Sequence, residues 1–336
     1  MTSTATSSAA IAPLRPGLWG VLATPFAGDT LAVDIASLQR EVRLFAGVPA
    51  TGLVVLGVFG EGASLDSAEQ ALVVRTVAAE VTATPLVVGL SARSTAMAIE
   101  QGRTAASAAG PAPAALMVQV NSAAPDVLAK HLNAIHAATG AGLVLQDYPA
   151  ASGVHISPAQ ILAVLALCPA IVAIKSEAPP TAAAIAELTA ATAIPVFGGL
   201  GGVGLLDELA AGAAGAMTGF SHPEALQAAL TAFSDGGFVE ARRVFAPWLP
   251  LVNFEAQPGV GLALRKEILR RRGVIREALV RAPAPALPAT LAGLLDAHLT
   301  AIETLKSKAG AAAAASRDLT ELTEPAEIAP PLEGAR

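Results

Sequence analysis

Lys175 is the side chain in this sequence best placed for covalent chemistry. It ends the apolar run at residues 170–174 and is followed directly by Ser176 and Glu177. An ammonium in apolar surroundings loses hydration, so its pKa falls and the neutral amine becomes available as a nucleophile. A fall of roughly three pKa units costs the fold about 4 kcal/mol. The chemistry that fits is attack on a ketone to form a Schiff base. The alternative is a strand-end lysine whose stem is buried and whose ammonium is solvated.

Other candidate residues share a position just after a strand-like run: Gly57, Val58, Phe59, Gly60, Glu61, Gln146, Asp147, Tyr148 and Gly199. Gln146 and Tyr148 are two residues apart, so they share a face if the strand continues that far. By the same spacing Lys175 shares a face with Glu177, whose carboxylate would keep the amine charged or act as an acid or base. The alternatives are that Tyr148 only packs and that Glu177 pairs with a surface cation.

Residues 198–204 are rich in glycine and contain a G-x-G-x-x-G match at Gly199, Gly201 and Gly204. The functional interpretation is close backbone approach to an anionic substrate, either a phosphate or a carboxylate. The alternative is a tight turn from a strand into a helix. A dinucleotide is not expected, because no acid follows about twenty residues later at a strand end to hold a ribose.

The sequence gives no pattern for a metal or for a serine nucleophile. The histidines lack ligand spacing with acids or cysteines: His131, His136, His155, His222 and His298. A G-x-S-x-G motif is absent as well. We therefore predict chemistry that uses neither a metal nor an organic cofactor.

Short aliphatic runs alternate with longer helix-like stretches along most of the chain. The runs lie at residues 20–24, 52–56, 85–89, 114–118, 142–145, 171–174, 194–197 and 215–218. Continuous apolar strands that alternate with helices are typical of a parallel sheet covered on both faces. Eight repeats in roughly 220 residues predict an α/β fold of the closed (β/α)8 TIM barrel type, with its chemistry at the carboxyl ends of the strands. An open doubly wound sheet is the alternative.

Composition divides the chain into four segments. Residues 1–15 and 306–336 are predicted to be disordered, because their composition buries too little apolar surface. The barrel is expected over residues 16–235, followed by a C-terminal helical extension over residues 236–305. In that extension the basic cluster at residues 265–272 spreads around more than one helix face, so part of it is expected to point at a partner or at Glu residues. The alternative, a solvated basic face, is the interpretation that we favour.

Bulk composition limits the partners that we expect. The net charge is −6 and the pI is about 5.4, so nucleic acid and anionic membrane surfaces are not predicted partners. The apolar runs are short, which argues against a membrane span. The single cysteine, Cys168, lies in an apolar run and is expected to be a buried hydrophobe. The first residues do not read as a signal peptide, so we expect a cytoplasmic protein.

From about residue 17 to residue 281 the chain resembles the dihydrodipicolinate synthase and N-acetylneuraminate lyase group of class I aldolases. The matching segments are Ala23-Thr24-Pro25-Phe26, Gly57-x-x-Gly60-Glu61, Ile174-Lys175 and Gly215-Ala216-Met217-Thr218. The resemblance implies a (β/α)8 barrel, a Schiff base between Lys175 and a 2-oxo acid such as pyruvate, and commonly a homotetramer.

The chain departs from this family at positions that matter for catalysis. Val58 and Phe59 stand where the family usually has two Thr or Ser residues that hold the carboxylate of the keto acid. Gln146 stands at the position of the catalytic tyrosine, and Tyr148 comes two residues later. Ala151 lies near the position of the arginine that holds the second substrate in the lysine-pathway members. A positioned proton-transfer group is worth roughly 10²–10⁴ in rate, so true dihydrodipicolinate synthase activity is not expected.

Our main hypothesis is a Schiff-base lyase, an aldolase or a dehydratase, that acts on another 2-oxo acid and forms a homodimer or homotetramer. Lys175 and Tyr148 are the predicted catalytic residues. The predicted substrate-binding residues are Gly57, Val58, Phe59, Gly60, Glu61, Gln146, Gly199 and Met217. A keto-acid sensor that has lost catalysis is the second hypothesis, motivated by the missing hydroxyls. A barrel that binds a phosphorylated substrate through residues 198–204 is the third.

Overall fold

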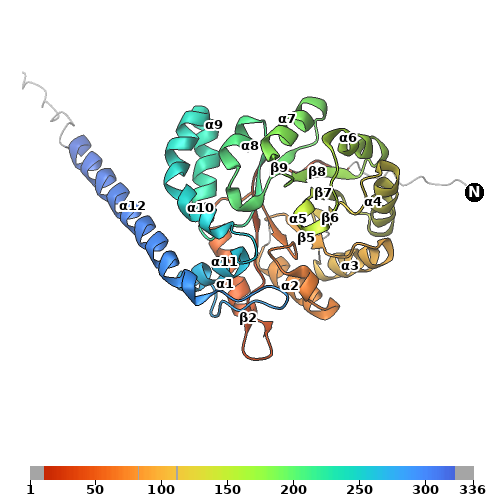
Figure 1. Cartoon of the computed structure of the whole chain (residues 1–336), viewed down its shortest axis with the longest axis horizontal. Coiled ribbons are helices and arrows are strands. Elements are labelled where there is room, and N and C mark those ends of the chain that lie inside the picture. Colours follow the sequence, from red (N-terminus) through yellow and green to blue (C-terminus); the bar gives the residue numbers. More distant parts are fainter. Residues whose placement is uncertain (1–10, 82, 111–112, 322–336) are drawn as a thin grey trace, which may run out of the picture. The chain divides into compact units, whose positions relative to one another are not determined.

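The computed structural model describes residues 11–81, 83–110 and 113–321, except for the side chains of residues 306 and 308–321. Eight parallel strands close a barrel in the order β1-β10-β9-β8-β7-β6-β5-β4. They are β1 Gly17–Val21, β4 Gly52–Val55, β5 Leu86–Leu90, β6 Ala115–Gln119, β7 Leu143–Asp147, β8 Ile171–Ser176, β9 Val196–Gly198 and β10 Gly215–Thr218. Helices surround the strands as a ring (Figure 1). The predicted (β/α)8 barrel is therefore confirmed.

Each apolar run that was predicted as a strand contributes one barrel strand. The first strand begins and ends three residues earlier than predicted. The prediction was residues 20–24, and β1 is Gly17–Val21. The sixth is longer than expected, because β8 continues through Lys175 to Ser176. Lys175 pairs in register with Gln146 of β7 and Phe197 of β9, so its side chain is fixed by the sheet and not by a loop.

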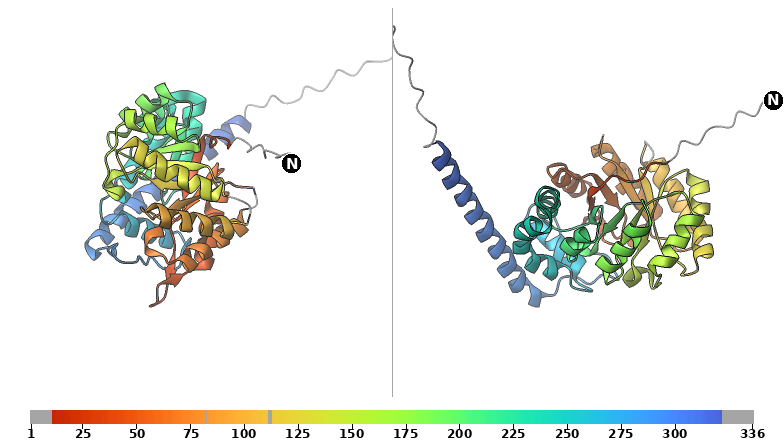
Figure 2. Two further views of the ribbon diagram at one scale, coloured as in Figure 1. Left: turned by 90° about the vertical axis from the view of Figure 1, so that its right-hand side faces the viewer. Right: turned by 90° about the horizontal axis from the view of Figure 1, so that it is seen from above.

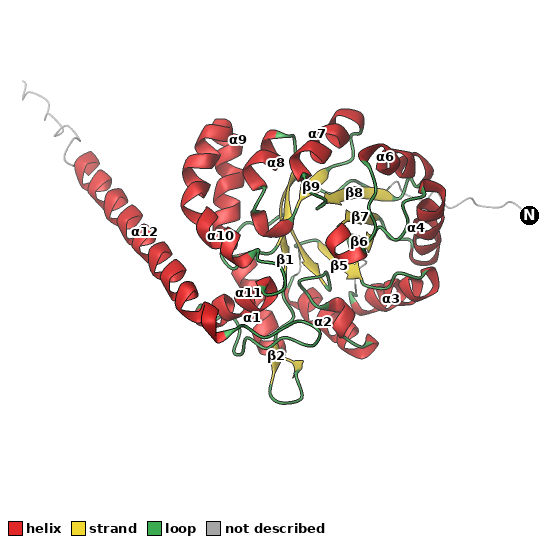
Figure 3. Cartoon of the chain, viewed as in Figure 1, coloured by secondary structure: helices red, strands yellow, loops and turns green. Residues whose placement is uncertain are grey.

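The barrel is covered by helices, several of which begin with favourable caps. They are α1 Ile35–Ala46, α2 Ser67–Glu80, α3 Thr95–Ala108, α4 Pro125–Thr139, α5 Pro149–Ser152, α6 Pro158–Leu167, α7 Thr181–Ala191, α8 Leu205–Ala210 and α9 Pro223–Phe245. Asp66 and Glu69 form a capping box at the start of α2, and α4 begins with Pro125, whose missing N–H would lack a partner there in any case. Figure 3 shows the strands inside this layer of helices, and Figure 2 shows the same arrangement from two further sides.

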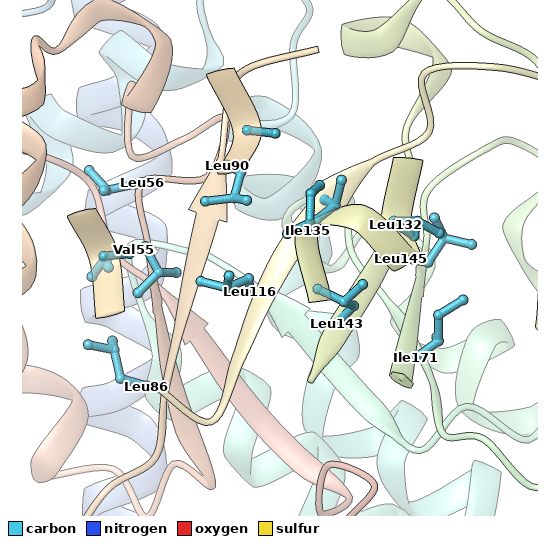
Figure 4. Close-up of a cluster of buried hydrophobic side chains, with 14 of the residues drawn as sticks. Val55, Leu56, Leu86, Leu90, Leu116, Leu132, Ile135, Leu143, Leu145 and Ile171 are labelled. Carbon is cyan, nitrogen blue, oxygen red and sulfur yellow. The ribbon is translucent and has the colours of Figure 1, made fainter. Parts of the chain in front are cut away.

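Two separate sets of buried side chains hold the barrel together. The larger set lies between the strands and the helices and includes Leu116, Leu143 and Ile171 (Figure 4). The other set fills the barrel interior and includes Trp19, Phe197 and Met217. Most members of the two sets are aliphatic, which agrees with a chain in which only 4% of the residues are aromatic.

The C-terminal part adds helices to the barrel unit. Gly237 has a φ of 69° and interrupts α9, close to the boundary expected after residue 235. The helices α10 Leu249–Glu255 and α11 Gly261–Arg271 follow, together with short 3-10 turns. The described residues from 288 to 321 form a second unit, which contains α12, Ala289–Glu321. In the part of the chain that the structure describes, no helix combines the length and the apolar character needed to cross a bilayer.

The predicted disorder at the two ends falls mainly outside the described residues. Residues 1–10 and 322–336 are not described. Of the remaining N-terminal residues, Leu14 is buried and its N–H donates to the Val172 carbonyl. Helix α12 continues past residue 306, to Glu321.

Candidate active site

The Lys175 amine is buried at the carboxyl end of the barrel. Ala173, two residues earlier on β8, belongs to the interior layer, so alternation along the strand directs Lys175 into the barrel as well. The residue is only 6% exposed. Its Nζ atom lies 3.1 Å from Glu177 Oε2. A buried amine with one carboxylate partner can lose its proton to that partner and attack a bound carbonyl.

Glu177 connects Lys175 to two other elements. Its Oε2 atom accepts a 2.7 Å hydrogen bond from Gln146 Nε2, and its Oε1 atom accepts a 3.1 Å bond from the Leu200 N–H. A Cβ atom at Gly199 would overlap Glu177 Oε1, so this position requires a glycine. Glu177 is thus held in place from β7 and from the loop after β9 while it faces Lys175.

Asp147 and Tyr148 follow Gln146 where β7 ends. Burial raises the pKa of Asp147 to about 6, with a further contribution from the negative charge of Glu177. Burial also raises the pKa of the Tyr148 hydroxyl, and Glu177 adds to this shift. The charge of Glu177 therefore acts on both groups and favours their protonated forms. Asp147 Oδ1 is buried and has no hydrogen-bond partner in the described structure.

The loop of residues 57–61 follows β4 and begins with a residue that faces the barrel interior. A Cβ atom at Gly57 would lie 3.3 Å from Met117 Cε, and one at Gly60 would lie 2.8 Å from the Leu56 backbone nitrogen. Phe59 packs on the interior layer, whereas Val58 is exposed. In the described residues, the N–H groups of residues 58–60 donate to no backbone or side-chain acceptor.

Glu61 has a different surrounding from the rest of this loop. Its φ is 50°, and its carboxylate pairs with the fully buried Lys266 of α11 and accepts a 3.0 Å bond from the Arg281 N–H. Thr24 Oγ1 donates a 2.6 Å hydrogen bond to the Gly60 carbonyl. These contacts fix the loop to the segment that follows β1 and to the C-terminal extension. The Glu61 carboxylate is therefore occupied by protein partners.

The glycine-rich loop of residues 198–204 already uses its own N–H groups. Leu200 donates to Glu177, and Gly201 donates a 2.8 Å bond to Thr218 Oγ1. Glu208 lies under the loop, where its carboxylate occupies the space that a side chain at Gly198 would fill. Burial raises the pKa of Glu208 to about 7. Carboxylates beside the loop disfavour a bound phosphate, so the structure gives the phosphate hypothesis no support.

Comparison with known proteins places this site in a family. The family model described as "Dihydrodipicolinate synthetase family" matches residues 15–301. The chain belongs to this family. The curated L-2-keto-3-deoxyarabonate dehydratase of Azospirillum brasilense is 30% identical over 292 residues, which cover 84% of this chain and 93% of the relative. The 4-hydroxy-tetrahydrodipicolinate synthase of Corynebacterium diphtheriae is 28% identical over 261 residues, covering 75% of this chain and 83% of the relative.

Solved structures of the family have the same architecture. The dihydrodipicolinate synthase of Rhodopseudomonas palustris is 28% identical, has a TM-score of 0.80, and the match covers 86% of this chain and 98% of that chain. The predicted family is therefore confirmed, and with it the class of enzyme, a lyase of the class I aldolase type.

In this member of the dihydrodipicolinate synthetase family, some of the predicted site residues lie together and others do not. Lys175, Gln146 and Gly199 meet around Glu177, as described above. Met217 is fully buried in the interior layer, and its contact with a substrate stays a prediction. Across the described ranges, no three His, Cys, Asp or Glu side chains are grouped as metal ligands.

The interpretation of residues 265–272 as a solvated face was wrong for Arg265 and Lys266. Arg265 is 2% exposed and Lys266 is 0% exposed, whereas Arg270 pairs with Glu267 at the surface. The sequence contains a signal for the burial of Arg265. Arg265 is four residues before Leu269 and thus on the same helix face as an apolar residue. Arg265 also lies over the Phe59 ring, with its Cζ atom 3.6 Å from the ring centroid.

Proposed function

We propose that this protein is a class I lyase that joins Lys175 Nζ to the C2 carbonyl of a 2-oxo acid. The observation that carries the proposal is the buried Lys175 amine, 3.1 Å from Glu177 Oε2, at the end of the barrel where such folds carry their chemistry. Membership in the dihydrodipicolinate synthetase family supports it.

Imine formation needs one proton acceptor next to the amine. Glu177 takes a proton from the Lys175 ammonium, and the nitrogen lone pair then attacks C2. The C2 oxygen receives one proton from the nitrogen and one back from Glu177. The C2–O bond then breaks and the oxygen leaves as water, so that a protonated imine remains on Lys175. Gln146 and the Leu200 N–H hold Glu177 in position for this transfer.

Dehydration is the reaction that we favour after the imine has formed. A base removes a proton from C3, the electron pair forms an enamine, and the enamine expels the C4 hydroxyl, which takes up a proton and leaves as water. Tyr148 is proposed to move these protons, with Asp147 as the second candidate. The named relative that supports this choice is a dehydratase of a 2-keto-3-deoxy sugar acid.

True dihydrodipicolinate synthase activity is not proposed. Gln146 occupies the tyrosine position and donates to Glu177, and Ala151 offers no cation for the carboxylate of a second substrate. The N–H groups of residues 58–60 are proposed to bind the carboxylate of the keto acid in place of the missing hydroxyls.

Borohydride trapping tests the proposal. Borohydride reduces an imine to a stable amine, so incubation with pyruvate and borohydride should add one pyruvate-derived mass at Lys175. Lys175→Ala should gain none. Lys130→Ala removes an exposed lysine on α4 and should trap pyruvate as the wild type does. Equal adducts on the wild type and on Lys175→Ala would refute the assignment.

A keto-acid sensor is the second candidate, and the Gln146–Glu177 contact is the observation that favours it. The amide at the tyrosine position donates to Glu177 and leaves this position without a phenol beside the amine. Thermal stabilisation by a panel of 2-oxo acids with no turnover of any of them would favour the sensor over the lyase. Turnover of even one 2-oxo acid would exclude it.

We also propose a cytoplasmic homo-oligomer, a dimer or a tetramer, as the working form. The support is the acidic composition and membership in a family in which we expect such assemblies. Light scattering after gel filtration measures the mass directly. A mass equal to one chain would contradict this proposal.

A further inference from the structure

Arg265 is a buried cation with a nitrogen that the protein does not satisfy. It extends from α11, and its Nε atom lies 3.4 Å from Glu255 Oε2. Its Nη1 atom is buried and has no hydrogen-bond partner in the part of the chain that the structure describes. A buried charged donor without an acceptor is costly, so it points to a ligand that the site is built to receive.

The Nη1 atom enters the barrel mouth through the space left by a glycine. Gly219 follows β10, two residues after Met217, which belongs to the interior layer. A Cβ atom at Gly219 would overlap Arg265 Nη1. Inward positions on alternate strands share a layer of a (β/α)8 barrel, so Gly219 on the β10 side and Glu177 on the β8 side border the same opening.

The loop of residues 57–61 meets Arg265 at this opening. Phe59 packs on the interior layer, and the guanidinium lies over its ring at 3.6 Å. Phe59 thus stands where the family usually has a hydroxyl. The Arg265 guanidinium stacked on its ring offers hydrogen-bond donors in place of that hydroxyl. A guanidinium held by an aromatic face and by Glu255 is oriented in advance, so it loses little freedom when it binds a carboxylate.

We propose that Arg265 Nη1 binds the carboxylate of the 2-oxo acid, together with the N–H groups of residues 58–60. This inference rests on the proposed function. It makes Arg265 the residue that selects substrates with a carboxylate. The carboxylate lies between the loop and the Gly219 opening while C2 reaches Lys175. Substrates in which a neutral group replaces the carboxylate gain less from Arg265, because a hydrogen bond to a neutral acceptor is weaker than one to a charged acceptor.

The test compares pyruvate with pyruvamide, which keeps the ketone and replaces the carboxylate by a neutral amide. Half-saturating concentrations for borohydride trapping at Lys175 are measured on the wild type and on Arg265→Gln. Loss of a hydrogen bond to a charged group should raise the pyruvate value about 10- to 100-fold. The pyruvamide value should rise less, by about 2- to 5-fold, because its amide carbonyl accepts a hydrogen bond from Arg265 but carries no charge.

A second variant covers the case in which Arg265→Gln does not fold. Arg265→Gln combined with Glu255→Gln removes both charges of the buried pair and should give the same difference between the two ligands. Equal half-saturation by pyruvate in wild type and variant would overturn the role of Arg265 and leave the imine assignment intact. Parallel losses for pyruvate and pyruvamide would show a structural role and also overturn it. Absence of any wild-type adduct would overturn the proposed function itself.

Discussion

Glu177 Oε2 lies 3.1 Å from Lys175 Nζ and 2.7 Å from Gln146 Nε2. One carboxylate oxygen thus joins the amine to the residue at the tyrosine position of the family. The amide of Gln146 donates a hydrogen bond to Glu177 and has no acidic proton to offer to a substrate. Proton transfer to and from the amine is therefore assigned to Glu177, and proton transfer at carbon to other groups.

Glu177→Gln tests this assignment. The amide keeps the size of the side chain but cannot take a proton from Lys175, so we expect imine formation to slow by about 10²–10³-fold. The rate of borohydride trapping at saturating pyruvate measures it. The matched control is Glu187→Gln, which changes an exposed residue of α7 and should leave the rate unchanged. An unchanged rate in Glu177→Gln would remove Glu177 from the mechanism.

Gly199→Ala tests whether the position of Glu177 matters. The added Cβ atom would overlap Glu177 Oε1, so the carboxylate must move away from its bond with the Leu200 N–H. We expect trapping at least about tenfold slower, as is typical when a catalytic group is displaced. Gly47→Ala is the control, because a Cβ atom there meets nothing closer than 3.5 Å. Wild-type trapping by Gly199→Ala would mean that the glycine is needed only for the turn.

Asp147 makes stability depend on pH. Its pKa is about 6 in the folded protein, above the value of 3.8 for a free side chain. The folded state therefore holds this proton more tightly, and stability falls as pH rises from about 4 to about 6. Asp147→Asn removes this effect, so it should raise the free energy of unfolding at pH 7.5 by about 1–3 kcal/mol.

Urea unfolding at pH 4 and at pH 7.5 checks this prediction. The gain from Asp147→Asn should shrink at the lower pH, where the carboxyl group is protonated in the folded protein. Asp29→Asn, at an exposed turn, serves as the control. A gain of the same size at both pH values would show that the substitution acts through packing and not through charge.

Lys266 and Glu61 hold the loop of residues 57–61 on the extension. Lys266→Met should lower the free energy of unfolding by about 3–5 kcal/mol, since it leaves the buried Glu61 carboxylate without its cation. Combining Lys266→Met with Glu61→Gln removes the second charge and should recover much of that loss. Chemical unfolding of the wild type, of Lys266→Met, of Glu61→Gln and of the double variant completes the cycle. Additive losses in the double variant would show that the pair is not coupled.

The sequence was sufficient to predict the barrel and the location of Lys175. The barrel follows from eight alternating repeats, and the apolar run that ends in Lys175 places this residue at the carboxyl end of a strand. Glu177 was also placed correctly relative to Lys175 by parity along the strand, as their 3.1 Å contact shows. The relevant contacts are local in sequence, and a regular element fixes them.

Long-range contacts could not be predicted in the same way. Arg265 lies more than 200 residues from Phe59 in the sequence, and nothing in either segment indicates that they stack. The Glu61–Lys266 pair is equally remote. The role of Gly199 was ambiguous for the same reason, since the sequence does not show which distant side chain fills the space beside it.

A crystal structure of the protein soaked with pyruvate tests the central claim most directly. The account predicts continuous electron density from Lys175 Nζ to C2 of the ligand, with the carboxylate at residues 58–60 and Arg265. Density that leaves Nζ paired only with Glu177, while pyruvate binds elsewhere or not at all, would contradict it.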